Sequence, residues 1–186
     1  PAERRPFLLD LGVWARFVLG IAIFSLMERM TEERLRTLQR RFMEAPLLAP
    51  ESWDAARAAV LRALRRRDSP AAEAVALALG LGLALVAATA IDRSEVSWLA
   101  RRTDAGASLT LAGGWCALVS APLYWFLGLR WLWRHLVWGL LLREIARLDL
   151  RLVVSHPDGA GGLAFIRGYP NAFAPLLFAP SSAMAA

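Results

Sequence analysis

Residues 71–91 read AAEAVALALGLGLALVAATAI and contain a single charged side chain. An apolar run of about 21 residues is long enough to cross a hydrocarbon core of about 30 Å as an α-helix. Gly80 and Gly82, placed among alanines, predict that this helix packs closely against another helix. The stretch therefore predicts a transmembrane helix, and the rest of the chain can be interpreted around it.

Two more apolar runs of similar length flank this helix. The first covers residues 7–27, FLLDLGVWARFVLGIAIFSLM, and carries only Asp10 and Arg16 as charges; the other covers residues 109–129. A partial fourth run, interrupted by prolines, covers residues 172–186. The pattern predicts an all-α, polytopic transmembrane helix bundle with three full spans and a partial fourth.

Composition agrees with a membrane protein. Of the 186 residues 57% are hydrophobic, whereas soluble domains average about 45–50%. The net charge of +6 comes from 22 arginines without any lysine, and these arginines lie beside the apolar runs, where anionic headgroups favour them. We therefore predict no nucleic-acid partner. Cys116, the single cysteine, lies in an apolar run and excludes an intrachain disulfide.

Arginine bias predicts the orientation of the spans. Residues 28–69 contain ten arginines and residues 92–108 contain three, so the positive-inside rule places the first segment in the cytoplasm and the second outside. Apolar residues recur at helical spacing on both sides of the prolines at 46 and 50, which predicts a cytoplasmic helical hairpin over 28–69. We expect residues 1–186 to form one membrane domain, cut from a longer chain.

Tryptophans and arginines cluster where the third span is predicted to end. Such residues anchor helices at the membrane interface, and the predicted anchors are Trp98, Arg130, Trp131, Trp133, Arg134 and Trp138. His135 lies among them and is a weak candidate ligand for haem or a chlorophyll-type pigment. Because no second ligand is evident, an ordinary interfacial histidine is the preferred interpretation, and no cofactor is predicted.

Arg16 is the main intramembrane charge. It stands about nine residues into the first span, or about 13 Å along a helix, and an ionisable group at that depth is a candidate functional residue. The alternative is a structural role, in which the guanidinium reaches the outer surface or pairs with Asp10 of a neighbouring helix.

The segment 155–163, SHPDGAGGL, carries the other candidate chemistry. His156 and Asp158 supply two metal ligands or an acid and base pair, but a metal site normally needs three or four ligands. The preferred interpretation is a tight structural turn in which the glycines permit positive φ angles and close backbone approach. The predicted structural loop consists of His156, Pro157, Asp158, Gly159, Gly161 and Gly162.

Several of these stretches together resemble a family of uncharacterised bacterial multi-pass membrane proteins that carry a His-Pro-Asp-x-x-Gly-Gly-Leu loop. The stretches are residues 118–138, 147–165, 7–24 and 62–69. The resemblance implies a bacterial inner-membrane location and further spans on both sides, with no activity to carry over. Val154 and Ser155 stand where the family has Pro-Thr before this loop.

Three functional hypotheses follow. Small-residue helix faces, tryptophan anchors and a cytoplasmic hairpin suit an accessory or scaffolding subunit of a larger membrane complex. A channel or transporter for a small solute or ion requires polar groups at mid-depth, of which Arg16 is the main example. A membrane-embedded enzyme would use the His-Pro-Asp loop. We favour the first, with no enzyme activity, and expect the lipid bilayer and other membrane subunits or a second copy as partners.

Overall fold

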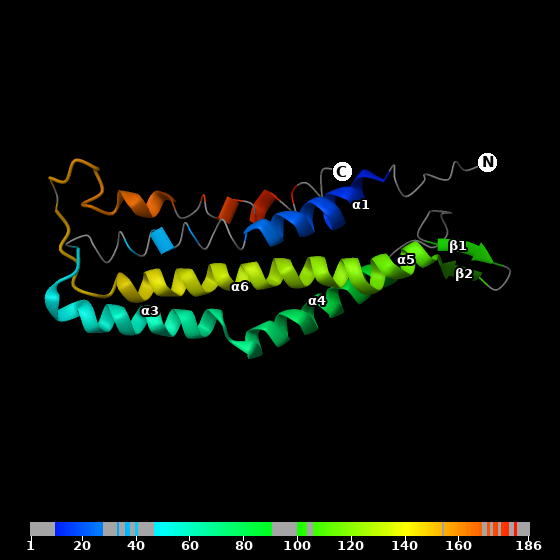
Figure 1. Ribbon diagram of the computed structural model, residues 1–186, viewed down its shortest axis with the longest axis horizontal. Helices are drawn as coiled ribbons and strands as arrows, with labels where there is room; N and C mark the ends of the chain where they lie inside the picture. The colour runs from blue at the N-terminus through cyan, green and yellow to red at the C-terminus, as the bar shows by residue number, and fades with distance from the viewer. Residues whose placement is uncertain are drawn as a thin grey trace. The chain divides into compact units, whose positions relative to one another are not determined.

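The computed structural model describes residues 10–27, 47–90, 100–103, 106–153 and 155–168, with isolated positions within 33–40 and 171–181. Most of these residues are helical, in agreement with the all-α prediction (Figure 1). The chain divides into two units: the first is Pro1–Phe24, Glu73–Arg130 and Phe178–Ala186, and the second is Ser25–Ala72 and Trp131–Leu177.

The described part of the predicted span at 7–27 forms a helix. It begins as α1 (Leu11–Val13), widens into the π-helical segment η2 (Trp14–Gly20) and continues as an α-helix to residue 27. Asp10 caps it, because the carboxylate Oδ1 accepts a hydrogen bond from the backbone N–H of Val13 at 3.3 Å. The predicted span at 7–27 is thus a helix from residue 11 onward.

The predicted span at 71–91 corresponds to α4 (Pro70–Ala90). A short 3₁₀ turn, η3 (Pro50–Ser52), leads into α3 (Trp53–Arg67), and only two residues separate α3 from α4. The second of these, Ser69, accepts a hydrogen bond on Oγ from a backbone N–H in the first turn of α4 at 3.5 Å. α3 is also the second half of the helical hairpin predicted over 28–69; the first half lies largely outside the described residues.

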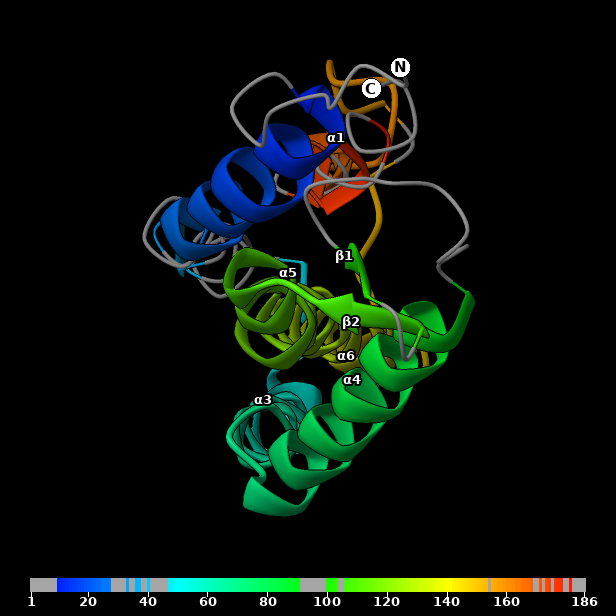
Figure 2. The same ribbon diagram turned by 90° about the vertical axis from the view of Figure 1, so that its right-hand side faces the viewer.

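The sequence did not predict the β-hairpin that precedes the next helix. β1 (Ala100–Thr103) and β2 (Gly106–Leu109) pair in antiparallel register (Figure 2). Thr103 is the only β-branched residue in the two strands, so β-propensity gave little signal. The third helix consequently begins at Leu111, with the hydroxyl of Thr110 accepting from the backbone N–H of Gly113 at 3.0 Å.

This third helix is also longer than predicted. It runs through α5 (Leu111–Trp115), the π-helical segment η4 (Cys116–Ser120) and α6 (Ala121–Ile145). The helix continues beyond residue 129, where the membrane span is predicted to end, because Arg130 and the tryptophans after it are compatible with a helix and no glycine or proline pair stops it there. The predicted interfacial anchors from 130 to 138 therefore lie within a continuing helix.

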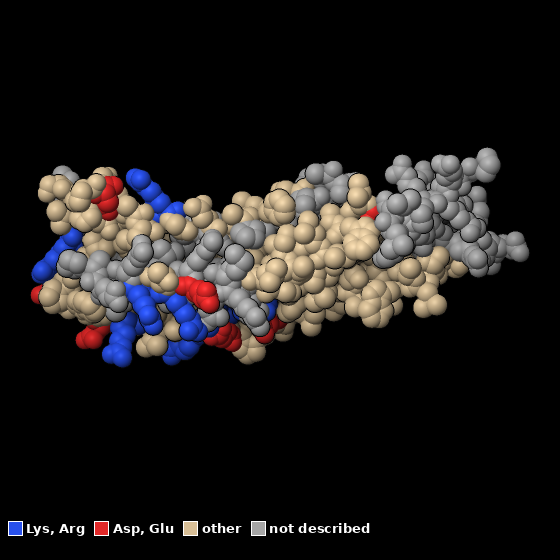
Figure 3. All heavy atoms as spheres, turned by 45° about the horizontal axis from the view of Figure 1, so that its top comes forward, with Lys and Arg blue, Asp and Glu red and all other residues tan. Residues whose placement is uncertain are grey.

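Two helical stretches in the described chain, Pro50–Thr89 and Leu111–Ile145, are long and apolar enough to cross a membrane, and Phe17–Met27 is a shorter apolar helix. Only 17% of the apolar window of each long stretch is buried, whereas a core helix of a soluble protein is mostly buried. Val86, Leu111 and Leu118 are 66%, 96% and 74% exposed. On the face shown in Figure 3, the described surface of the first unit is mostly uncharged, and the blue and red side chains gather over the second unit.

The core of the first unit is built around Tyr124 of α6, which is buried. Phe17 and Phe24 of the first helix contact its ring, with centroids 6.4 and 5.7 Å away. Gly20 lies between them, and a Cβ there would be 2.7 Å from Cε2 of Tyr124. The glycine is therefore needed for the close approach of these two helices.

α4 packs against α6 through a face of small residues. A Cβ added to Gly80 would lie 2.9 Å from the backbone N of Phe126, and Ala76 and Ala84, one turn to either side, are buried. The prediction of close packing is therefore confirmed for Gly80. For Gly82 it stays a prediction, because an added Cβ there would meet nothing within 4 Å among the described residues.

The second unit has its own core, formed where α3 lies along the C-terminal half of α6 (Figures 1 and 2). Alanines recur on the inner face of α3 at helical spacing, which lets the two helices approach closely. The buried residues of this core are Leu48, Ala56, Ala59, Ala63, Val137, Leu141 and Ile145.

Candidate functional site

The loop that follows α6 is tied to the segment that precedes α3. Leu48 and Leu150 form an isolated antiparallel bridge, and the backbone N–H of Arg151 donates to the carbonyl of Leu47 at 2.7 Å. The same pairing is visible in Figure 1, where the start of α3 lies beside the loop that leaves α6. The His-Pro-Asp segment thus begins only a few residues beyond a fixed backbone contact.

Asp158 organises this loop. Its Oδ1 accepts hydrogen bonds from the backbone N–H groups of Ala160 and Gly162 at 2.9 and 3.1 Å, and its Oδ2 accepts from Ala164 at 3.0 Å. These donors would otherwise have no partner in a segment without regular structure, where unpaired backbone groups are costly. One carboxylate therefore holds together the seven residues from 158 to 164.

His156 adds a fourth contact to the same carboxylate. Its Nδ1 lies 2.8 Å from Oδ1 of Asp158 and 3.3 Å from the backbone N–H of that residue. A single ring nitrogen cannot donate to one and accept from the other at once, and the shorter contact with the charged oxygen sets the proton on Nδ1. The imidazole itself is 42% exposed.

These contacts shift the ionisation of Asp158. Partial burial acts to raise the pKa of the carboxyl, but the backbone hydrogen bonds from Ala160, Ala164 and Gly162, followed by that from His156, outweigh it and hold the pKa well below its usual range. Asp158 is therefore ionised throughout the physiological range. A carboxylate with such a low pKa is a poor general base.

Three glycines complete the turn, and each has a positive φ. The angles are +64° at Gly159, +65° at Gly161 and +97° at Gly162. A Cβ at Gly162 would lie 2.9 Å from Cδ2 of Leu47, so this position combines a left-handed backbone with a close neighbour. The observed geometry of His156, Pro157 and Asp158 is that of a compact turn closed by hydrogen bonds.

Among the residues that the structure describes, no group of three or more His, Cys, Asp or Glu side chains is placed to hold a metal ion. Asp158 directs both carboxylate oxygens at the backbone of its own loop. The pairing of His156 with Asp158 therefore positions the imidazole and stabilises the loop.

A second charged cluster was not predicted. Glu144 of α6 accepts from Arg62 at 2.9 Å and from Arg66 at 2.7 Å, both on α3. The two arginines are four residues apart and thus on one face of their helix. This spacing is the only feature of the sequence that indicates a shared partner. We call these three residues the arginine clamp.

The predicted anchor Trp133 supports the same junction. Its indole Nε1–H donates to the carbonyl of Arg66 at 3.0 Å, near the end of α3. That carbonyl belongs to the last turn of the helix, where intrahelical donors run out. Trp133 thus acts as a C-terminal cap for α3, while Trp138 packs against the core of the second unit.

Phe173 brings the remaining α6 anchors together. It is buried, and its ring lies edge-on to His135 at 4.6 Å and to Trp131 at 6.3 Å between centroids. The guanidinium of Arg134 lies 5.0 Å from the ring centroid of Trp131, a cation–π geometry. The candidate pigment ligand His135 is accordingly part of an aromatic cluster.

The other predicted charges have different environments. Arg130 donates from Nε to Glu73 of α4 at 3.1 Å, within the first unit. Asp10 is the helix cap described above, six residues before Arg16 on the same helix. The side chain of Arg16 and all of Trp98 lie outside the described residues.

We compared the chain with protein-family models, curated proteins and solved structures, and none of them matches it.

Proposed function

We propose that the protein is a multi-pass membrane protein of the bacterial inner membrane that serves as an accessory or scaffolding subunit of a larger membrane assembly. In this proposal the first helix, α4 and the helix from residue 111 to about 129 cross the bilayer, and α3 lies on the cytoplasmic side. Two features of the first unit support this proposal: the position of its ion pair along the helices and the small-residue faces of α4.

The ion pair between Glu73 and Arg130 supports the placement of one membrane boundary at this level of the two helices. Glu73 is in the first turn of α4, and Arg130 follows the apolar part of the third helix. From Glu73 to the end of α4, and from Leu111 to Arg130, the helices rise roughly 26 to 28 Å, close to the hydrocarbon thickness of about 30 Å. Two antiparallel spans that share a charged pair at one end fit a bilayer of that thickness.

The observation that carries the scaffolding proposal is a second small-residue face on α4. Ala76, Gly80 and Ala84 form the face buried against α6. On the opposite side, Ala74, Ala78 and Gly82 also recur every four residues, and all three are exposed. Helices in membranes associate through such faces because small residues allow backbones to approach closely. A helix face that contacts only lipid can carry leucines. The small residues on this face therefore suit close packing against a helix of another subunit.

The test is Gly82→Leu, purified in mild detergent, with the mass of the native assembly measured. We expect the wild-type protein to carry partner subunits and Gly82→Leu to lose them. Gly114→Leu is the matched control, since a side chain there also meets nothing within 4 Å but projects from α5. Assemblies of equal mass for wild type and Gly82→Leu would contradict the proposal.

A further inference from the structure

One side of α3 combines aromatic, aliphatic and cationic side chains. Trp53, Arg57, Leu61 and Arg65 are spaced four residues apart and so form one stripe along the helix, which we call the outer stripe. Trp53 is 40% exposed and Leu61 is 51% exposed, and both arginines are exposed as well. Tryptophan and arginine are among the residues most enriched where protein surfaces meet, so this composition is typical of a contact with another protein.

The outer stripe lies on the side of α3 that faces away from its packing partner. The opposite side, with Ala56, Ala59 and Ala63, is buried against residues 137–145 of α6. Both α3 and this part of α6 belong to the second unit. The exposure of the outer stripe is therefore a property of the second unit alone.

The arginines of α3 fall into two groups. Two belong to the arginine clamp, and a third, Arg67, pairs with Asp68 at 2.8 Å. Within the described chain, no acidic side chain forms an ion pair with Arg57 or Arg65, although Asp54 is only three residues before Arg57. The helix thus pairs the cations beside the outer stripe and leaves those on the stripe without a counter-ion.

We propose that the outer stripe of α3 docks an acidic amphipathic helix of a partner protein. Its two cations require carboxylates on the partner, and guanidinium groups match carboxylates with two parallel hydrogen bonds. Eight residues separate Arg57 from Arg65, or about 12 Å along the helix, so two carboxylates eight residues apart on a helix that lies along the stripe reach both. Leu61 lies midway between the arginines and requires an apolar residue midway between the two carboxylates.

Trp53 extends the contact by one turn beyond Arg57. Its indole offers a large apolar surface to a further apolar side chain of the partner. The partner helix therefore presents apolar, acidic, apolar and acidic residues at successive four-residue steps. This docking goes beyond the proposed function, because it uses the second unit alone and does not require α4 to cross a membrane.

The test uses the full chain in mild detergent and a fluorescently labelled synthetic helix. The first peptide carries leucine, glutamate, leucine and glutamate at successive four-residue steps on an alanine background. A second peptide has the same composition, with the two glutamates on opposite faces. Fluorescence anisotropy measures the Kd of each. We expect the first peptide to bind and the second to bind roughly tenfold more weakly, because it cannot form both ion pairs while covering the leucine.

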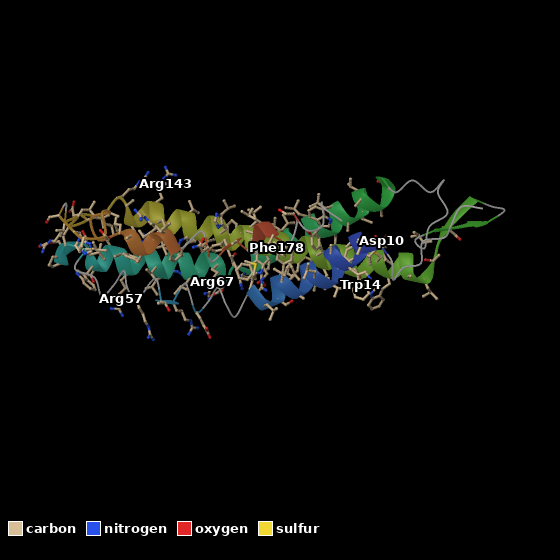
Figure 4. The ribbon with its side chains drawn as sticks, turned by 90° about the horizontal axis from the view of Figure 1, so that it is seen from above. Asp10, Trp14, Arg57, Arg67, Arg143 and Phe178 are labelled. Carbon is tan, nitrogen blue, oxygen red and sulfur yellow. The ribbon has the colours of Figure 1, made fainter. Side chains whose placement is uncertain are left out.

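Variants of the chain locate the cationic part of the contact. Arg57→Gln with Arg65→Gln should weaken binding of the first peptide roughly tenfold, the effect of losing two exposed ion pairs. Arg143→Gln with Arg147→Gln is the matched control, because it removes the same charge elsewhere in the second unit. In Figure 4 the side chain of Arg143 projects from the opposite side to Arg57.

The apolar part of the contact is tested in the same way. Leu61→Ala should weaken binding of the first peptide roughly fivefold, because it removes apolar surface between the two ion pairs. Leu136→Ala is the matched control, since Leu136 of α6 lies in the second unit and is 52% exposed. Circular dichroism checks that all variants keep their helices.

Three outcomes would overturn the docking of an acidic helix. The first is wild-type protein that does not bind the first peptide. The second is equal binding of the two peptides, or an equal effect of each variant and its control, since either would show attraction to net charge alone. The third is binding of the soluble lipid dihexanoyl-phosphatidylglycerol, lost in the Arg57 and Arg65 variant, without binding of the peptide. None of the three bears on whether α4 crosses a membrane, so the proposed function stands or falls separately.

Discussion

At the scale of single residues, Gly162 is the most constrained position in the described chain. Its φ of +97° disfavours any side chain, and the nearest atom to an added Cβ belongs to Leu47. Gly162→Ala should therefore destabilise the second unit by about 1–3 kcal/mol. Gly139→Ala, at an exposed helical glycine with open space around it, should instead stabilise by about 0.4–1 kcal/mol. Thermal unfolding in detergent measures the stability change of both variants. A change of the same sign in the two variants would contradict the role given to the backbone angle at Gly162.

The lowered pKa of Asp158 predicts how the stability of its loop depends on pH. Because its folded-state pKa lies below the unfolded value of about 3.9, the stability it contributes is complete above that value and is lost as the pH falls through the folded pKa. Amide protection at Ala160, Gly162 and Ala164, corrected for intrinsic exchange, should stay constant down to about pH 4 and decline below it. Asp158→Asn should lower protection at neutral pH and remove this dependence. A decline that begins well above pH 4 would contradict the role given to Asp158.

At the scale of helices, the arginine clamp should stabilise the pairing of α3 with α6. Its side chains are partly exposed, so screening by solvent limits each ion pair to about 0.2–1 kcal/mol. Glu144→Gln should therefore cost about 1 kcal/mol of unfolding free energy at low salt, and less as salt increases. Asp149→Asn is a suitable control, because only its backbone carbonyl makes a described contact. Equal losses in both variants would show that the clamp contributes nothing specific.

At the scale of helices, part of the fold could be predicted from the sequence and part could not. The helix at 70–90 was predicted almost to the residue, because hydrophobicity and length alone decide it. The positive φ of Gly159 also followed from local turn chemistry. The contacts of Glu144 with arginines about 80 positions earlier were not predictable, since spacing on one helix carries no information about its neighbour. The continuation of α6 past Arg130 was not predicted either, because arginines and tryptophans mark a membrane interface without ending a helix.

At the scale of the whole molecule, the proposed topology places α3 and the β-hairpin on opposite sides of the membrane. Cysteines introduced at Ala55 and Ser108, both exposed, should react with an impermeant thiol reagent from opposite faces in a Cys116→Ala background. Ala55 should react from the cytoplasmic face, because the arginine-rich segment is retained there. Labelling of both positions from one face would rule out the orientation.

The π-helical segment η4 has a consequence for how this chain tolerates change in length. A π turn closes its hydrogen bonds over one more residue than an α turn, so Cys116–Ser120 holds one residue in excess of a regular helix. Losing one residue there converts the segment to an ordinary helix and leaves Tyr124 facing the same way. Losing one residue from the middle of α4 turns everything beyond it by about 100°. Lineages related to this protein should therefore differ by single deletions at η4 and keep the length of α4 constant.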